Sequence, residues 1–202
     1  MSAERKSKKR QDILAGAQRV FVREGFDGAS MEEIAREAKV AKPTLYNHFR
    51  DKSSLYVAVV EDALTKTRDA ILPPSIRDLP AKEAIKLLAQ RLTIMFGRDD
   101  DVLKLCRICI GGYERFPLGS STFMQHGPRR GTDQVSELIE LWRDRGEVSC
   151  TDPKIAAQQL SEMCKVGIWD PRLYAERDKV PLEECERVAE EAVLTFMARY
   201  FT

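Results

Sequence analysis

Residues 30–56 read SMEEIAREAKVAKPTLYNHFRDKSSLY, and this stretch decides the fold. Ser30 and Glu33 form an S-x-x-E capping box, which marks a helix start because each side chain can satisfy an amide of the other's turn. Apolar residues then recur at helical spacing up to a short turn, after which Leu45 and Phe49 lie four residues apart on a second helix. The stretch predicts two short helices joined by a tight turn and followed by a third, which is the layout of a helix-turn-helix.

The second helix of this motif carries polar side chains outside its apolar stripe. Cations, hydroxyls, an amide and an imidazole suit phosphate oxygens and the edges of bases. We therefore predict that double-stranded DNA binds this helix through Lys42, Pro43, Thr44, Tyr46, Asn47 and His48.

The charge of the chain is distributed unevenly. Residues 1–52 carry 12 Lys and Arg against 8 Asp and Glu, a balance of +4, whereas all 202 residues together give +1. The basic excess lies with the helix-turn-helix, where a polyanion would bind. Part of it comes from residues 1–10, which we expect to form a mobile basic arm.

Several classes of protein are disfavoured by the composition. No apolar run reaches the roughly 18 residues of a membrane helix, so no membrane partner is expected. Five cysteines, an odd number, argue against a secreted disulfide scaffold. We expect a cytoplasmic protein with reduced thiols. Neither a phosphate-binding loop nor a metal triad is indicated, so no cofactor or metal is expected.

Beyond the motif the pattern remains helical, so the predicted fold class is all-α, with nine or so helices. A long helix should follow Asp51 and end before Pro73-Pro74, the clearest boundary in the chain. Gly25 should stop the first helix. Outside the helix-turn-helix, helices are expected over residues 11–23, 81–97, 100–116, 118–126, 132–145, 152–169 and 181–200.

The chain resembles the TetR family of transcriptional regulators in two places. Residues 11–56 contain, in order, F-x-x-x-G, I-A-x-x-A, T-L-Y-x-H-F and K-x-x-L. The C-terminal half is similar to the ligand-binding domain of the AefR-like subgroup. That similarity rests on YERFP at 113–117, HGP at 126–128, RGEV at 145–148, DP at 152–153 and AAQ at 156–158.

The resemblance implies a homodimer that binds a palindromic operator and usually represses, until a small-molecule effector changes the spacing of its two DNA-binding heads. It implies a DNA-binding domain over residues 1–52 and a helical effector-binding and dimerisation domain over residues 53–202. Lys42, Pro43 and Thr44 would approach base edges, and Thr44, Tyr46, His48 and Lys52 would contact phosphates. The two C-terminal helices would pair with those of the partner, so a charge at Leu160 or Phe196 is expected to split or unfold the dimer.

Two positions depart from the family pattern. Lys39 occupies a turn position where the family commonly has Gly, at a cost of roughly 1 kcal/mol if the backbone there is left-handed. Glu32 lies near the start of the first motif helix, where some members have a base-contacting residue. Its charge would repel phosphate, so Glu32 is not expected to contact DNA.

The expected effector is small and mostly apolar, and other interpretations remain open for the C-terminal half. The predicted effector-binding residues are Met95, Phe96, Gly111, Tyr113, Phe116, Phe123, Trp142 and Met163, although at helical spacing most such residues are simply core. The Cys106-x-x-Cys109 pair is compatible with buried structural cysteines, with a thiol-responsive regulator, or with part of a zinc site, although zinc usually needs four ligands. An all-helical enzyme is the rival class and is less favoured.

Overall fold

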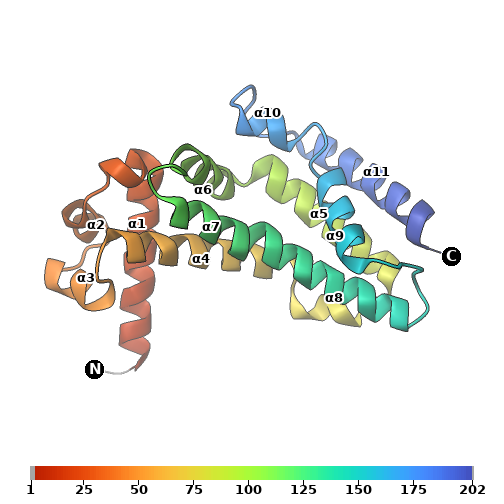
Figure 1. The fold of residues 1–202 in the computed structure, drawn as a ribbon, viewed down its shortest axis with the longest axis horizontal. Coiled ribbons are helices and arrows are strands. Elements are labelled where there is room, and N and C mark those ends of the chain that lie inside the picture. Colours follow the sequence, from red (N-terminus) through yellow and green to blue (C-terminus); the bar gives the residue numbers. More distant parts are fainter. Residues whose placement is uncertain (1–2, 202) are drawn as a thin grey trace. The chain divides into compact units, whose positions relative to one another are not determined.

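The computed structural model describes the backbone of residues 3–201 and the side chains of residues 7–201, and in that range every regular element is a helix. The described chain packs into two compact units. The first runs to Thr65 and includes Lys104–Gln125, and the second comprises Lys66–Leu103 and the part after Gln125. The helices in chain order are α1 (Ala3–Gly28), α2 (Met31–Glu37), α3 (Lys42–His48), α4 (Lys52–Ile71), α5 (Ala81–Arg98), α6 (Asp100–Gly111), α7 (Pro117–Met124), α8 (Arg130–Asp144), α9 (Pro153–Met163), α10 (Trp169–Leu173) and α11 (Leu182–Tyr200), shown in Figure 1.

The first helix begins earlier than the sequence pattern predicts. Residues 3–10, expected to be a mobile arm, continue α1, because Ala, Lys, Arg and Glu have high helix propensity. Met1 and Ser2 of the expected arm lie outside the described residues. Gly25 interrupts α1 with φ 73° and ψ 178°, a left-handed conformation that favours glycine, at the predicted stop.

Three other expected boundaries are wrong. The helix expected over residues 100–116 ends at Gly111, because Gly lacks the side chain and the backbone restriction that favour a helix. The helix expected over residues 152–169 ends at Met163, and Pro171, expected to stop it, lies in the first turn of α10, where a missing amide is tolerated. The break expected at Gly127-Pro128 is instead a five-residue π-helical turn that leads directly into α8.

The core of the N-terminal unit is aromatic. The rings of Phe21 and Tyr56 meet edge to face at 5.0 Å, and those of Phe26 and Phe116 stack at 4.3 Å. Tyr56 also meets Phe116 at 5.6 Å. Gly119 approaches this cluster so closely that a Cβ there would lie 2.8 Å from the Tyr56 ring. Long-range packing therefore joins α4 and α7 to the first helices, and the compact units divide the chain at different points from the expected boundary at residue 52.

The C-terminal unit is built from two helix pairs, α5 with α11 and α8 with α9 (Figure 1). Its core includes Leu88 of α5, Trp142 of α8, Leu160 of α9 and Phe196 of α11, each at most 1% exposed. Leu160 and Phe196 thus lie in the chain's own core.

A buried arginine in this unit forms hydrogen bonds to the end of α5. Arg172 is 1% exposed, and its guanidinium donates to the carbonyl oxygens of Phe96 (2.9 Å) and Asp178 (2.8 Å). It also donates to a carboxylate oxygen of Asp100 at 2.5 Å. Because these groups supply acceptors and a countercharge, burial of the arginine is compensated.

Candidate nucleic-acid interface

The turn of the helix-turn-helix is closed by backbone hydrogen bonds. At the end of α2 the amide of Val40 donates to the carbonyl of Ala35 (3.0 Å), and the amide of Lys39 donates to that of Arg36 (3.1 Å). These two bonds are those of a Schellman motif, which requires a left-handed residue after the helix. Lys39 occupies that position with φ 53°. Lys39, which departs from the family pattern, is therefore a residue with a strained backbone.

The start of α2 is fixed by its cap and by α1. Ser30 Oγ accepts from the amide of Glu33 at 3.2 Å, as the capping box predicts. The Glu33 carboxylate accepts from Arg23 of α1 (2.6 Å), and Glu37 accepts from Arg19 (2.6 Å). Hydrogen bonding to Arg19 lowers the pKa of Glu37, as expected for a carboxylate beside a cation. These surface pairs link α2 to α1.

Two buried residues anchor α3 and thereby present its polar side. Leu45 is 0% and Phe49 5% exposed, as their spacing predicts. Lys42, Pro43, Tyr46 and Asn47 are exposed, and Thr44 and His48 are half-buried. The helix brings all six predicted DNA-contacting residues of α3 onto its accessible part. Tyr46 is 44% exposed, so its side chain is accessible to a binding partner.

The ammonium of Lys42 is already engaged across the turn. It donates to a carboxylate oxygen of Glu32, in the first turn of α2, and lies 6.0 Å from the centroid of the Tyr46 ring. Both partners are exposed, with 53% of the Lys42 side chain and 62% of the Glu32 side chain accessible. The hydrogen bond lowers the pKa of Glu32 and raises that of Lys42, so both stay charged near neutral pH. Reasoning from spacing missed this pair because its members are ten residues apart, on different helices.

Lys52 points back onto the protein. Its ammonium donates to the carbonyl oxygens of Asp27 (3.2 Å) and Ala29 (2.9 Å) and lies 4.7 Å from the centroid of the Phe26 ring. An ammonium has three N–H donors, so one is left for an anion. Lys52 therefore holds the connection between α1 and α2 as well as lying in the first turn of α4.

The predicted effector-binding residues do not gather in one unit. Met95, Phe96, Trp142 and Met163 belong to the C-terminal unit, and Gly111, Tyr113, Phe116 and Phe123 to the N-terminal unit. Phe116 is in the aromatic core, Phe123 and Phe96 are buried, Tyr113 is 58% exposed, and Gly111 has open space around it. Trp142 is completely buried, and its indole N–H has no hydrogen-bond partner among the described residues. A buried N–H group normally donates a hydrogen bond, so this one is available to an acceptor atom.

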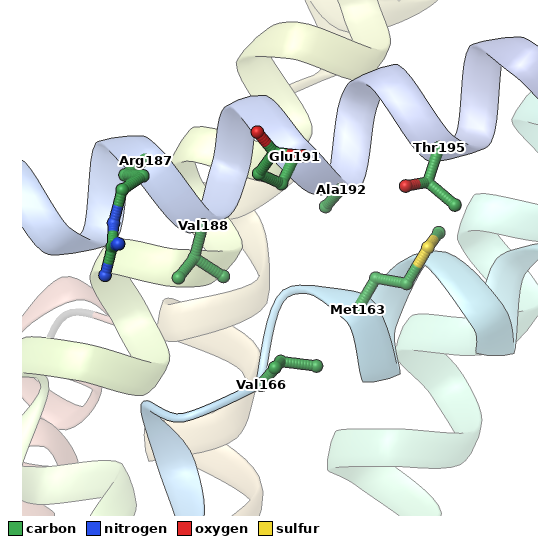
Figure 2. A pocket seen from close by; sticks show the side chains of 7 residues that line it. All are labelled: Met163, Val166, Arg187, Val188, Glu191, Ala192 and Thr195. Carbon is green, nitrogen blue, oxygen red and sulfur yellow. The ribbon is translucent and has the colours of Figure 1, made fainter.

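Met163 lies at a groove of about 450 Å³ in the C-terminal unit. Figure 2 shows Met163 and Val166 facing Val188, Ala192 and Thr195 of α11. Arg187 and Glu191 complete the lining from the same helix. A second, more polar groove of about 370 Å³ is lined by the end of α4, the 3₁₀ turn Pro74–Asp78 and α8.

The possible metal ligands, the apolar helices and the cysteines of the described part of the chain are distributed as follows. No cluster of three or more potential metal ligands occurs there, and no described helix has the length and apolar character to cross a bilayer. All five cysteines are buried and free of disulfides. Burial raises the pKa of Cys109, whose sulfur lies 3.3 Å from the Tyr56 hydroxyl oxygen, so the thiol is protonated rather than reactive.

Two family models together match most of the chain. Residues 13–59 match the family described as bacterial regulatory proteins, tetR family. Residues 83–202 match the C-terminal domain of the AefR-like transcriptional repressors.

Individual proteins similar to this chain are also transcriptional regulators. The transcriptional activator FasR of Mycolicibacterium smegmatis is 45% identical over 56 residues, covering 28% of this chain and 26% of that protein. The transcriptional repressor AcnR of Corynebacterium diphtheriae is 30% identical over 93 residues, covering 44% and 49%. The chain thus spans between about a quarter and a half of the length of these two relatives.

Solved structures are similar over almost the whole length. The crystal structure of a TetR-family transcriptional regulator from Mesorhizobium loti has a TM-score of 0.87 at 28% identity, covering 98% of this chain and 99% of that one. The flavonoid-responsive regulator FrrA has a TM-score of 0.78 at 23% identity, covering 96% and 98%, and shows the shared fold.

Proposed function

Because the chain belongs to the TetR family of bacterial regulatory proteins, we propose that it regulates transcription by binding a palindromic DNA operator as a homodimer. The observation that carries this proposal is the polar, accessible side of α3, held outward by buried Leu45 and Phe49. A dimer with two-fold symmetry requires two half-sites separated by whole turns of DNA. Repression is favoured over activation because the C-terminal half matches a repressor family.

In this proposal the chain divides by function at residue 52. Residues 1–52 bind DNA, and residues 53–202 bind the effector and dimerise. Lys42, Pro43 and Thr44 read base edges, while Thr44, Tyr46, His48 and one N–H of Lys52 hold phosphates, and Asn47 belongs to the same DNA-facing surface. An operator on the chromosome would place the protein in the cytoplasm.

We propose that α9 and α11 form the dimer interface. Ile155 (47% exposed), Leu194 (60%) and, just after α9, Val166 (66%) leave apolar surface uncovered on these elements. The groove in Figure 2 lies between the same elements, with an apolar floor and one charge of each sign from Arg187 and Glu191. Two copies of one surface that carries both charges can pair across a two-fold axis.

The effector is proposed to be a small, mostly apolar molecule bound by the C-terminal domain. Buried aromatic residues supply apolar walls, and the unpaired indole N–H of Trp142 supplies one donor for an acceptor atom on the ligand. An effector can release DNA only through a differential affinity for the two states of the dimer. A typical coupling weakens operator binding by about five- to 150-fold.

The alternatives have less support. A thiol-responsive regulator needs an accessible, low-pKa cysteine, whereas Cys106 and Cys109 are buried, at 8% and 4% exposed. An all-helical enzyme is the rival class, but both matching families are families of regulators.

Selection of DNA by the purified full-length protein tests the proposal. A palindromic sequence should be enriched from random duplexes, and a protected site of that sequence should lie near the gene that encodes the protein. Tyr46→Ala should weaken binding to that operator at least about ten-fold without lowering stability, since Tyr46 is exposed. Tyr174→Ala removes a tyrosine that is 75% exposed in the other unit and is the matched control.

Two results would contradict the proposal. Enrichment of no sequence would reject specific DNA binding, and equal operator affinities of Tyr46→Ala and wild type across salt concentrations would reject the contact surface. Tyr46 is a cleaner test than Lys52, because Lys52→Ala also removes two hydrogen bonds to backbone carbonyls.

A further inference from the structure

The ion pair between Glu32 and Lys42 is not explained by the stability of the fold. Both side chains are more than half exposed, and exposed ion pairs contribute little because solvent screens them. The first turn of α2 already has a second acid, Glu33, to favour the helix dipole. On a surface proposed to bind a polyanion, a carboxylate that neutralises Lys42 lowers the attraction to every phosphate.

A carboxylate beside a cation does match one feature of DNA. In the major groove, guanine presents the acceptors O6 and N7, and its paired cytosine presents the N4 amino donor beside them. Lys donates to guanine O6 and N7, and Glu accepts from cytosine N4. A cation and an acid held in contact therefore complement the two halves of a single G·C base pair.

The surroundings hold the two groups in this arrangement. Glu32 is placed by the capped start of α2, and Lys42 by the first turn of α3, which Leu45 anchors. The Tyr46 ring lies 6.0 Å from the ammonium, at the limit of a cation–π contact. A preorganised pair loses less conformational entropy on binding than two free side chains do.

We infer that the Glu32–Lys42 pair reads one G·C base pair in each operator half-site, with Lys42 on the guanine and Glu32 on the cytosine. This inference rests on the proposed function, because it requires α3 to lie in the major groove. It reverses the expectation that Glu32 stays away from DNA. In the inferred complex the Glu32 carboxylate faces a base edge. Repulsion between this carboxylate and phosphates, the reason for not expecting Glu32 at the DNA, therefore disfavours other placements of the head on DNA and not this one.

The experiment compares base preferences of full-length wild type and Glu32→Ala on the selected operator and on all single-base-pair changes in it. Wild type should prefer G·C at one position per half-site by roughly 5- to 150-fold, the range for a good base contact. Glu32→Ala should reduce that preference at this position alone, because Lys42 can still donate to the guanine. Glu83→Ala, which removes another acid from the first turn of a helix, α5, is the matched control and should change no preference.

Base analogues identify the atoms involved. Inosine in place of the guanine keeps O6 and N7 and should bind wild type as tightly as guanine does. Replacement by 7-deazaguanine removes N7 and should weaken binding by wild type more than binding by Lys42→Met.

Other outcomes overturn the inference in distinguishable ways. If Glu32→Ala binds every duplex more tightly by one common factor and keeps all preferences, Glu32 only neutralises Lys42, and the reading role is rejected. If wild type enriches no sequence at all, the proposed function itself is rejected.

Discussion

Lys39 shows how a single residue can be unfavourable for folding and still belong to a surface that binds DNA. Its φ of 53° places a side chain in the left-handed region, where an L-residue loses roughly 1 kcal/mol or more relative to glycine. Lys39 is also exposed beside α3. A cation at this point can therefore improve association with a polyanion while it strains the turn.

Lys39→Gly should raise the free energy of unfolding by up to about 1 kcal/mol, since relief of the strain exceeds the added entropy of the unfolded chain. Urea denaturation measures the change. Lys39→Ala removes the same charge but keeps the left-handed cost, so it should give no such gain. A gain with Ala as large as that with Gly would mean that charge, and not backbone strain, is responsible.

Burial should protect the cysteine thiols from alkylation. Burial raises the pKa of Cys164 to about 12 and also raises the pKa values of Cys109 and Cys185, so these thiols stay protonated at pH 8. Because the thiolate is the nucleophile, iodoacetamide should modify them at least about a hundred-fold more slowly in the native protein than in urea. Mass spectrometry of the alkylated peptides measures this ratio. Fast native modification of Cys109 that also released DNA would instead support a thiol-responsive regulator.

At the scale of elements, the DNA-binding head depends on a close approach of α1 to the end of α2. A Cβ on Gly16 would lie 2.7 Å from the Cβ of Ala38 and 2.8 Å from its Cα and N. Backbone atoms cannot rotate away as a flexible side chain can, so the two helices would have to separate.

Gly16→Ala should therefore lower the free energy of unfolding by about 1–3 kcal/mol, and weaken operator binding by displacing α2. Gly131→Ala is the matched control, because nothing lies within 4 Å of a Cβ at that position in α8. It should stabilise the protein by about 0.5–1 kcal/mol through helix propensity. Thermal unfolding of both variants checks the opposite signs, and equal effects would show that the contact of Gly16 is unimportant.

For the whole molecule, the structure separates residues that hold the chain together from those available to a partner. Leu160 and Phe196 are 0% and 1% exposed, so a charge at either should unfold the protein rather than split a folded dimer. The sequence left open whether these variants would split the dimer or unfold the protein. The core position of both residues predicts unfolding.

Leu194→Glu and Val166→Glu should instead yield folded monomers. Both side chains are at least 60% exposed in the single chain, so a charge there costs little until a second copy covers it. Sedimentation at micromolar concentration, with circular dichroism to verify folding, measures the result. Ile110→Glu, at an apolar position 54% exposed in the other unit, is the control and should leave the dimer intact. Dimers that persist in both test variants would place the interface elsewhere.

Local patterns in the sequence were sufficient to predict much of the helical structure of this protein. The Ser30 cap on the Glu33 amide, the four-residue spacing of Leu45 and Phe49, and a break in the helix at Gly25 are confirmed, because each depends on hydrogen bonds or packing within a few residues. The helix resumes after Gly25 and ends at Gly28, and the Glu33 carboxylate bonds Arg23, so the capping box forms only in part. The helical fold class follows from the same periodicity. The helical start at Ala3 differs from the expected mobile arm, because helix propensity there outweighs the repulsion between like charges.

Only the tertiary structure decided where side chains of established helices point and what they meet. The partners of Lys52 are 23 and 25 residues away in the chain, and two partners of Arg172, Phe96 and Asp100, lie more than 70 residues away, at the end of α5 and start of α6. Helical spacing marked Phe116 and Trp142 as apolar but could not separate core residues from the walls of a site. The side of a helix that packs is set by long-range contacts, and these depend on the arrangement of all helices together rather than on the order of residues in any one of them.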